Sequence, residues 1–409
     1  MAKTRNKSFF LNLILISLAI SPSFALGLDN RNLLLIGLMS LSPIFVLMNL
    51  KFGKMDKLLL FFLASIVVFP YLFQVESMRW STVLYSIMFG LTFIAFKQLL
   101  RKNYFSVADY FKILKYLIYA YFIVLLIQQF CVLTGLPIFN LSNYDPNEPW
   151  KLNSLSAEPS HSARIVALLM YSYITIKELI TNRKYSLKFD LKKDKWVWIF
   201  FIWIMITMGS GTAILFIIIV FLKFLRFKKL LPFIITGIIF ISILDSSGIK
   251  SFQRTKNVIL SSLTLNESAI LQADHSAAMR IVPIVVAAKK VAFNSFNDWF
   301  GYGIDFTTSF ISDEVPGIPE GLSGGGMFQI WLEYGFISFA LFVAFSLSNI
   351  YRKKDYLSFI FWFLLVFVYG VNNQIVWLCI ILLYVNRYFL KKTNFKNKNL
   401  FKKSILIKK

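Results

Sequence analysis

The stretch MFQIWLEYGFISFALFVAFSLSNI, residues 327–350, holds a single charged side chain, Glu333, among its 24 residues. An α-helix of about 20 mostly apolar residues crosses the roughly 30 Å hydrocarbon core of a bilayer. Lipid offers no partner to free backbone N–H and C=O groups, and the alternating pattern of a membrane β-barrel is absent from the sequence. We therefore expect residues 327–350 to form a transmembrane helix.

Apolar runs of this kind recur along nearly the whole chain of 409 residues, of which 57% are hydrophobic and 16% are charged. This composition excludes an ordinary water-soluble fold. The runs predict twelve spans, near residues 8–26, 31–49, 58–74, 80–96, 116–136, 162–180, 196–209, 212–227, 230–245, 327–350, 356–371 and 375–390. The expected fold is one all-α, polytopic membrane domain over residues 1–409. The first run also resembles a cleavable signal peptide, which would leave the later topology unchanged.

The basic residues predict the orientation of this bundle. A net charge of +24 could indicate a nucleic acid partner, but the Lys and Arg residues lie between the apolar runs. With the N-terminus in the cytoplasm, 34 of the 44 Lys and Arg residues fall on the cytoplasmic side, as the positive-inside rule requires. The C-terminus is then also cytoplasmic, and residues 391–409 form a basic tail. Two longer outer loops, about 138–161 and 246–326, remain, and loops of that length usually carry function.

The two cysteines predict no redox or metal chemistry. Cys131 and Cys379 each lie inside an apolar run, where a cysteine ordinarily packs as a small buried hydrophobe. The sequence also lacks a histidine cluster or an Asp-x-Asp pair that would hold a metal ion. We therefore expect no disulfide, no metal site and no cofactor.

The first candidate site is SAEPSHSAR, residues 156–164, where the chain re-enters the membrane after the first long outer loop. Pro159 favours a helix that begins just after Glu158, so His161 and Arg164, three residues apart, would share one helical face. A carboxylate, an imidazole and a guanidinium group so close together are unusual in such an apolar chain. The alternative is an ordinary helix start, with Glu158 near the positive end of the helix dipole and Arg164 reaching to lipid head groups.

The second candidate is ADHSAAMR, residues 273–280, in the second long outer loop. It contains the other histidine of the chain, His275, as well as Arg280. Planar, permanently charged guanidinium groups grip phosphate well, so Arg280 and also Arg254 suit an anionic lipid carrier. The alternatives are a structural salt bridge between Asp274 and Arg280, and a solvated loop histidine.

Glycines mark three further segments. GYGID, residues 301–305, includes Gly303, and GLSGGGMFQ, residues 321–329, runs into the span that holds Glu333. Glycine permits tight turns and close approach of a ligand, although it also simply ends loops. Glu333 is the only acidic residue placed within a predicted span, which makes it a functional candidate with an outer-face arginine as its expected partner. GSGT, residues 209–212, is either a tight turn or part of a substrate site.

These features, in this order, resemble the O-antigen polymerase and O-antigen ligase superfamily of bacterial envelope proteins. The likeness is best over residues 156–350. It rests on EPSHSAR, GSGT, Arg280 followed by the Ala-rich amphipathic stretch 281–293, GYG, and the Glu333-Tyr334-Gly335 pattern. Each motif is weak by itself, and their order and placement give the specificity.

The resemblance implies a multi-pass protein of the bacterial inner membrane that transfers a glycan from undecaprenyl diphosphate onto another lipid-linked repeat unit. Its partners would be undecaprenyl-diphosphate-linked oligosaccharides, the lipid bilayer and a chain-length regulator protein, with no nucleic acid. Arg280 and Arg164 would stabilise the diphosphate, with Arg254 in reserve, and Glu158 or His161 would handle the acceptor proton. His275, Gly303 and Glu333 complete the expected substrate site.

One departure separates the members of this superfamily. Ligases usually carry a His-Asn pair about nine residues before the glutamate, and this chain has Gly324 and Gly325 there. The missing histidine favours a polymerase over a ligase, which stays an alternative. A flippase of lipid-linked units is a second alternative, but such proteins usually have short loops on both sides.

The orientation can be tested with reporter fusions. Because basic residues concentrate on one side, we expect fusions at Asn153 and Gly317 to report a periplasmic location and fusions at Tyr185 and Asn399 a cytoplasmic one. A cytoplasmic signal at Gly317 would overturn the orientation.

Overall fold

The computed structural model describes residues 2–20, 33–48, 52–139, 148–224, 267–273, 275–315, 325–352 and 355–407, together with residues 253, 256–257 and 260–261. Of residues 2–7, 275–277, 280 and 394–407 it describes the backbone alone. Within these ranges the chain is helical and forms no strand, which confirms the all-α prediction. The expected span 230–245 and Arg254 lie outside the described residues.

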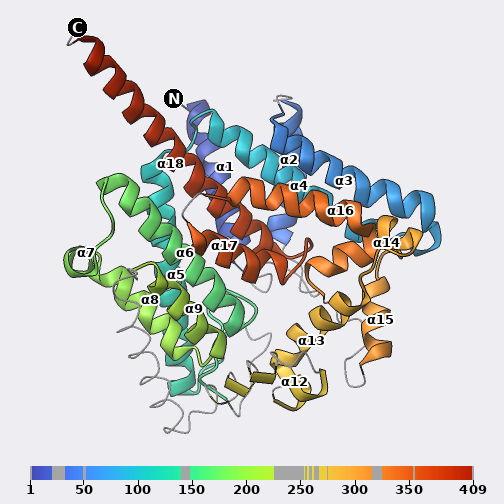
Figure 1. Ribbon diagram of the computed structural model, residues 1–409. Helices are drawn as coiled ribbons and strands as arrows, with labels where there is room; N and C mark the ends of the chain where they lie inside the picture. The colour runs from blue at the N-terminus through green and yellow to red at the C-terminus, as the bar shows by residue number, and fades with distance from the viewer. Residues whose placement is uncertain are drawn as a thin grey trace.

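Five described helices are long and apolar enough to cross a membrane (Figure 1). They are α3 (Lys54–Phe73), α4 (Trp80–Arg101), α5 (Val107–Thr134), α16 (Met327–Ile350) and the first 20 residues of α18 (Gln374–Ile407). Shorter apolar helices are α1 (Ala2–Ala19), α2 (Leu33–Leu47), α8 (Lys195–Thr207), α9 (Gly211–Leu222) and α17 (Tyr356–Trp362), which a π-helical turn η4 (Phe363–Phe367) continues. The fold is therefore that of a helical membrane protein.

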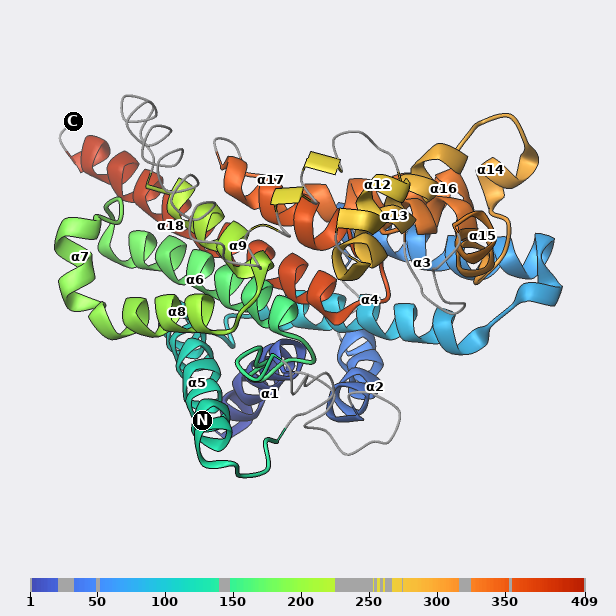
Figure 2. The same cartoon turned by 90° about the horizontal axis from the view of Figure 1, so that it is seen from below.

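Helix α6 (Pro159–Thr181) lies inside the bundle, packed against α5, α8, α9 and α18 (Figure 2). Every residue from 162 to 176 is buried. A helix that is buried on all sides holds its side chains in fixed positions. Its first residue is Pro159 and its N-cap is Glu158, in extended conformation, which confirms the predicted helix start. Outside this core, the short helix α7 (Leu187–Lys193) connects α6 to α8.

The second long predicted loop contributes four helices. They are α12 (Glu267–Ala273), α13 (His275–Lys290), α14 (Phe296–Phe300) and α15 (Phe306–Glu314), drawn in gold and orange in Figure 1. Helices α13, α14 and α15 contact α16, and α12 packs on α13. Helices α12, α13 and α15 share a small hydrophobic core made of Ile270, Ala278, Val282, Val285, Val286, Ile311 and Val315. The predicted helix at 281–293 is present, but it starts earlier, at His275, and ends at Lys290.

A buried ion pair joins four apolar helices at one end of the bundle. The Nζ atom of Lys97 lies 2.6 Å from Oδ1 of Asp56, and the two side chains are 2% and 1% exposed. Lys97 also donates to Asn349 of α16 and lies over the ring of Tyr384 of α18. Asp56 is thus a buried acidic residue within an apolar helix, as Glu333 is. The sequence pattern missed the pair because its spans began at 58 and ended at 96, whereas α3 begins at Lys54 and α4 ends at Arg101.

Replacing one partner of this ion pair should destabilise the bundle more than replacing both. We expect Lys97→Met to lower the free energy of unfolding by about 3–5 kcal/mol, because it leaves the Asp56 carboxylate buried without its cation. The double variant Asp56→Asn/Lys97→Met should recover most of that loss. Thermal unfolding in detergent measures both, with Arg101→Met, a half-exposed residue 3.7 Å from the same carboxylate, as the control with a small effect. Equal losses in the single and double variants would contradict the assignment.

Candidate functional site

A network of hydroxyl and amide groups fixes the backbone before α6. The Ser156 and Ser162 hydroxyls lie 2.6 Å apart, and Ser162 donates to the carbonyl oxygen of Asn153. The Ser154 N–H donates to Oε1 of Gln128 on α5 at 2.8 Å. All five residues are buried. Since buried polar groups that are satisfied rigidify their surroundings, the first turn of α6 is held in one place.

The first turns of α6 carry the predicted cluster. Ser160 donates to Oε2 of Glu158 at 3.0 Å, next to the helix N-terminus. His161 borders a small cavity of about 200 Å³ whose other walls come from Tyr85, Ser156, Ala157, Ile165, Asn372, Asn373, Gln374 and Ile375. The imidazole therefore faces the polar segment that precedes α18.

Arg164 and His161 meet at one aromatic ring. The guanidinium carbon of Arg164 lies 4.6 Å from the ring centroid of Tyr369, and the His161 ring packs against the edge of that ring at 6.3 Å. The shared helical face predicted for His161 and Arg164 is confirmed. Arg164 is only 7% exposed, so it lies inside the bundle and does not reach outward as a head-group anchor would. Stacking occupies the flat face of a guanidinium group, while the N–H groups on its edge are the ones that bind phosphate oxygens.

Two glycine segments cross each other at the start of α16. The Tyr302 N–H donates to the carbonyl oxygen of Leu332 at 2.7 Å, and α16 breaks at Gly335, where φ is 84°. A Cβ atom on Gly335 would lie 2.1 Å from the Trp299 carbonyl oxygen, and one on Gly301 would lie 2.3 Å from that of Glu333. The close approach leaves room only for glycine at both positions. The crossing brings together the GYG and Glu-Tyr-Gly patterns that the family resemblance singled out.

A capped turn stabilises this crossing from the loop side. The Asp298 carboxylate accepts hydrogen bonds at 2.8 Å from the Ser295 N–H and from the Tyr302 hydroxyl. Burial alone would raise the pKa of the Asp298 carboxyl, but these hydrogen bonds outweigh it and hold the pKa below its usual value. The indole N–H of Trp331 donates to the Asp298 carbonyl oxygen at 3.0 Å. Helix α14 is therefore tied to the segment that contains Glu333.

Glu333 lies in the eight residues of α16 that precede this break. Its side chain is 1% exposed, and its Oε1 accepts a hydrogen bond of 2.9 Å from Gln329. The buried Thr307 lies beside it. Among the described contacts, Gln329 thus stands where an arginine partner was expected, and Arg79 pairs instead with Asp305 at 2.8 Å.

The segment 367–370 links the α6 cluster to Glu333. A Cβ atom on Gly326 would lie 2.4 Å from the carbonyl oxygen of Phe367, and one on Gly370 would lie 3.8 Å from Oε1 of Gln329. Tyr369, which packs on Arg164 and His161, therefore has Gln329 close to its neighbour Gly370. His161 and Arg164 of α6 and the Gln329–Glu333 pair of α16, far apart in the sequence, thus lie against the same short segment.

The structure describes the remaining predicted residues only in part. Helix α13, which carries His275 and Arg280, contacts α16. Just before α16, a Cβ atom on Gly325 would lie 3.2 Å from that of Ala287 in α13. The side chains of His275 and Arg280, and all of Asp274 and Arg254, lie outside the described residues.

Two glycines of the predicted set have packing roles. Gly303 has φ of 109°, and a Cβ atom there would lie 2.3 Å from the Ser77 hydroxyl in the 3-10 turn η2 (Val75–Ser77), so close packing accounts for it. Gly209, with φ of 63°, makes the tight turn between α8 and α9 that was one of the two interpretations of GSGT. These contacts explain the glycines without a ligand.

Sequence reasoning missed the segment that brings the site together. Tyr369, Asn372 and Asn373 lie in the connection before α18, and Gln374 begins that helix. They supply the ring and three amides near the start of α6. Three adjacent amide side chains between two apolar runs were the available signal. Comparison with known protein families, curated proteins and solved structures gave no match to this chain.

The glycine crossing can be tested by a pair of matched substitutions. Gly335→Ala should prevent stable folding of the α14–α16 region, since a Cβ atom there overlaps backbone and the positive φ is strained by about 1–3 kcal/mol for a non-glycine residue. Gly37→Ala in α2 should be neutral or stabilising by about 1 kcal/mol, because nothing lies within 4 Å of the added atom. Limited proteolysis and thermal unfolding compare the two. Equal stability of both variants would show that the crossing is not tight.

Proposed function

We propose that this protein polymerises undecaprenyl-diphosphate-linked oligosaccharide repeat units into O-antigen or a related surface polysaccharide, at the periplasmic face of the bacterial inner membrane. The observation that carries the proposal is the buried Arg164, held on the Tyr369 ring beside His161, at the start of a helix that is itself buried. A fixed, planar cation at such a position suits a diphosphate leaving group.

The membrane placement in this proposal extends the observed helices to twelve spans with both termini in the cytoplasm. Five long and five shorter apolar helices support it, as does the concentration of Lys and Arg residues between alternate runs. The α6 start, the segment 367–374 and the loop helices α12 to α15 would then share the periplasmic side. A lipid-linked substrate could keep its chain in the bilayer while its diphosphate meets Arg164.

The reaction needs one bond to form and one to break. The hydroxyl oxygen of the acceptor sugar attacks the anomeric carbon of the donor glycan, and the bond from that carbon to the diphosphate oxygen breaks, which releases undecaprenyl diphosphate. Arg164 and Arg280 would neutralise the charge that grows on the diphosphate. Glu158 or His161 would accept the hydroxyl proton, and both lie at the same helix start.

The two alternatives fit the site less well. In a ligase the position of Gly325 usually carries the asparagine of a His-Asn pair, but here φ is 97° and a Cβ atom would lie 3.2 Å from that of Ala287. A flippase would need ionisable groups along a path through the spans. The buried pair Asp56 and Lys97 is instead a closed contact at one end of the bundle.

A null strain tests the function. If the protein is the polymerase, the strain should still cap its lipopolysaccharide core with one repeat unit, because flipping and ligation survive. A bare core would contradict the proposal, and long polymer accumulating on undecaprenyl diphosphate would indicate a ligase. Gel separation of lipopolysaccharide, with a blot of the lipid-linked pool, distinguishes these outcomes.

Complementation of that strain assigns the residues. Arg164→Ala should lower polymer synthesis by about 10²-fold, and Arg164→Lys should rescue poorly, because a point charge lacks both the planar fork and the stacking on Tyr369. Glu158→Gln and His161→Ala should give the single-unit pattern if these groups handle the proton. Arg79→Ala, which removes an exposed arginine paired with Asp305, is the matched control and should keep the full ladder.

A further inference from the structure

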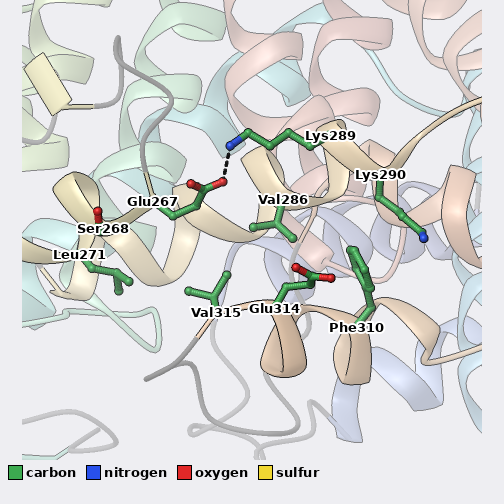
Figure 3. Close-up of a pocket in the computed structure, with 9 residues that line it drawn as sticks. All are labelled: Glu267, Ser268, Leu271, Val286, Lys289, Lys290, Phe310, Glu314 and Val315. Atoms are coloured by element: carbon green, nitrogen blue, oxygen red, sulfur yellow. Dashed lines mark hydrogen bonds and ion pairs between the residues drawn. The ribbon is translucent and has the colours of Figure 1, made fainter.

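A second cavity lies in the loop helices, away from the α6 cluster. It has a volume of about 690 Å³ and is bordered by α12, α13, α15 and the residue after α15 (Figure 3). Its walls are Glu267, Ser268, Leu271, Val286, Lys289, Lys290, Phe310, Glu314 and Val315. A volume of this order is typical of pockets that hold small organic ligands, in the range of about 300–1,000 Å³.

Packing contacts hold the wall residues of the cavity in place. Val286 and Val315, two of its walls, belong to the small hydrophobic core shared by α12, α13 and α15, and Leu271 packs against that core. Phe310 stacks on Phe306, one helical turn earlier, with ring centroids 5.6 Å apart and planes 10° apart. Because its walls are already ordered by these contacts, the cavity is preformed.

The charges in the cavity compensate each other. Nζ of Lys289 lies 2.5 Å from Oε1 of Glu267, and this bond lowers the pKa of the Glu267 carboxyl, so the pair stays ionised (Figure 3). The ammonium group of Lys290 lies 5.2 Å from the centre of the Phe310 ring and 5.9 Å from that of Tyr302. Two lysines and two glutamates line the cavity, so it lacks the clear excess of positive charge that a diphosphate site needs. The balance favours an uncharged, polar ligand.

The other side chains that line the cavity are of the kinds that bind sugars. A carboxylate such as that of Glu314 accepts hydrogen bonds from two neighbouring hydroxyl groups, and Ser268 supplies a hydroxyl that both donates and accepts. Pyranose rings also have apolar C–H faces, which pack on aromatic and aliphatic side chains such as Phe310 and Leu271. The cavity thus combines the two kinds of surface that a sugar ring presents.

The cavity lies near the start of α16, which carries Glu333. Val286, Lys289 and Lys290 line it from α13, and Ala287 of the same helix packs against Gly325 at the start of α16. One helix, about 10 Å thick, therefore separates the cavity from the segment that carries Glu333. Arg280 lies on the same helix seven residues before Ala287, about 10 Å along its axis.

From this position and chemistry we infer that the cavity between α12, α13 and α15 is a carbohydrate-binding site that holds sugar rings of the growing glycan near the start of α16. The inference rests on the proposed polymerase function and adds a second glycan contact, remote from the diphosphate. A glycan chain held there stays on the protein between the additions of successive repeat units, so the site should influence the length of the polymer.

Binding to the purified full-length protein tests the inference. The probe is a set of oligosaccharides of a few repeat units, cut by mild acid from the surface glycan of the source strain, and calorimetry in detergent measures the affinity. Glu314→Gln and Phe310→Leu should each weaken binding by about tenfold or more, since they remove a charged acceptor and a flat ring. Asp313→Asn, the adjacent exposed carboxylate outside the cavity, should leave the affinity unchanged.

The same variants in the null strain separate this inference from the proposed function. We expect Glu314→Gln and Phe310→Leu to shift the glycan ladder to shorter chains while Asp313→Asn restores the normal ladder. Unchanged affinity and unchanged ladders in both cavity variants would overturn the carbohydrate site, even if the null strain shows the single-unit pattern. Competition by inorganic diphosphate would also overturn it, in favour of an anion site. A normal ladder in the null strain would instead reject the polymerase function itself.

Discussion

Backbone polar groups without water must bond to each other, and this constraint governs the rest of the structure. In apolar surroundings a helix satisfies them within one segment, so irregular backbone is confined to places where other protein groups supply partners. Among the described residues, such places include the loop before Pro159, the crossing of 301–303 with 333–335, and the segment 367–373. The side chains that could do chemistry are gathered at these irregular segments, because there the chain leaves room for something other than packing.

The convergence of these segments could not be inferred from order along the chain. More than 150 residues separate the start of α6 from the start of α16. About 40 more separate the start of α16 from the connection before α18. Tyr369 touches Arg164 and His161, and its neighbour Gly370 lies against Gln329, which binds Glu333. The catalytic proposal depends on this meeting, since Tyr369, from outside α6, holds the Arg164 guanidinium group beside His161.

Sequence patterns predicted the positions of the helices better than the side-chain contacts between them. Residues 327–350 form α16 over the predicted range, and Glu158-Pro159 marks the start of α6, because composition and proline act locally. The Asp56–Lys97 pair and the amides of 372–374 escaped notice, since a polar residue at the edge of an apolar run looks the same whether it is solvated or buried. Tertiary packing alone decides between those states. Among the described contacts Gln329, one turn earlier, donates to Glu333, and the arginine partner stays a prediction, since Arg254 and the side chain of Arg280 lie outside the described residues.

The central claim, that the site joins lipid-linked sugars, is tested most directly by reconstitution. The purified chain would be placed in vesicles with single repeat units on undecaprenyl diphosphate, without nucleotide or added metal, and the products separated by gel and mass spectrometry. The account predicts a ladder of longer lipid-linked glycans, with one undecaprenyl diphosphate released for each new bond, and no ladder with Arg164→Ala. Repeat units that cross the bilayer unchanged, with no longer product, would contradict it.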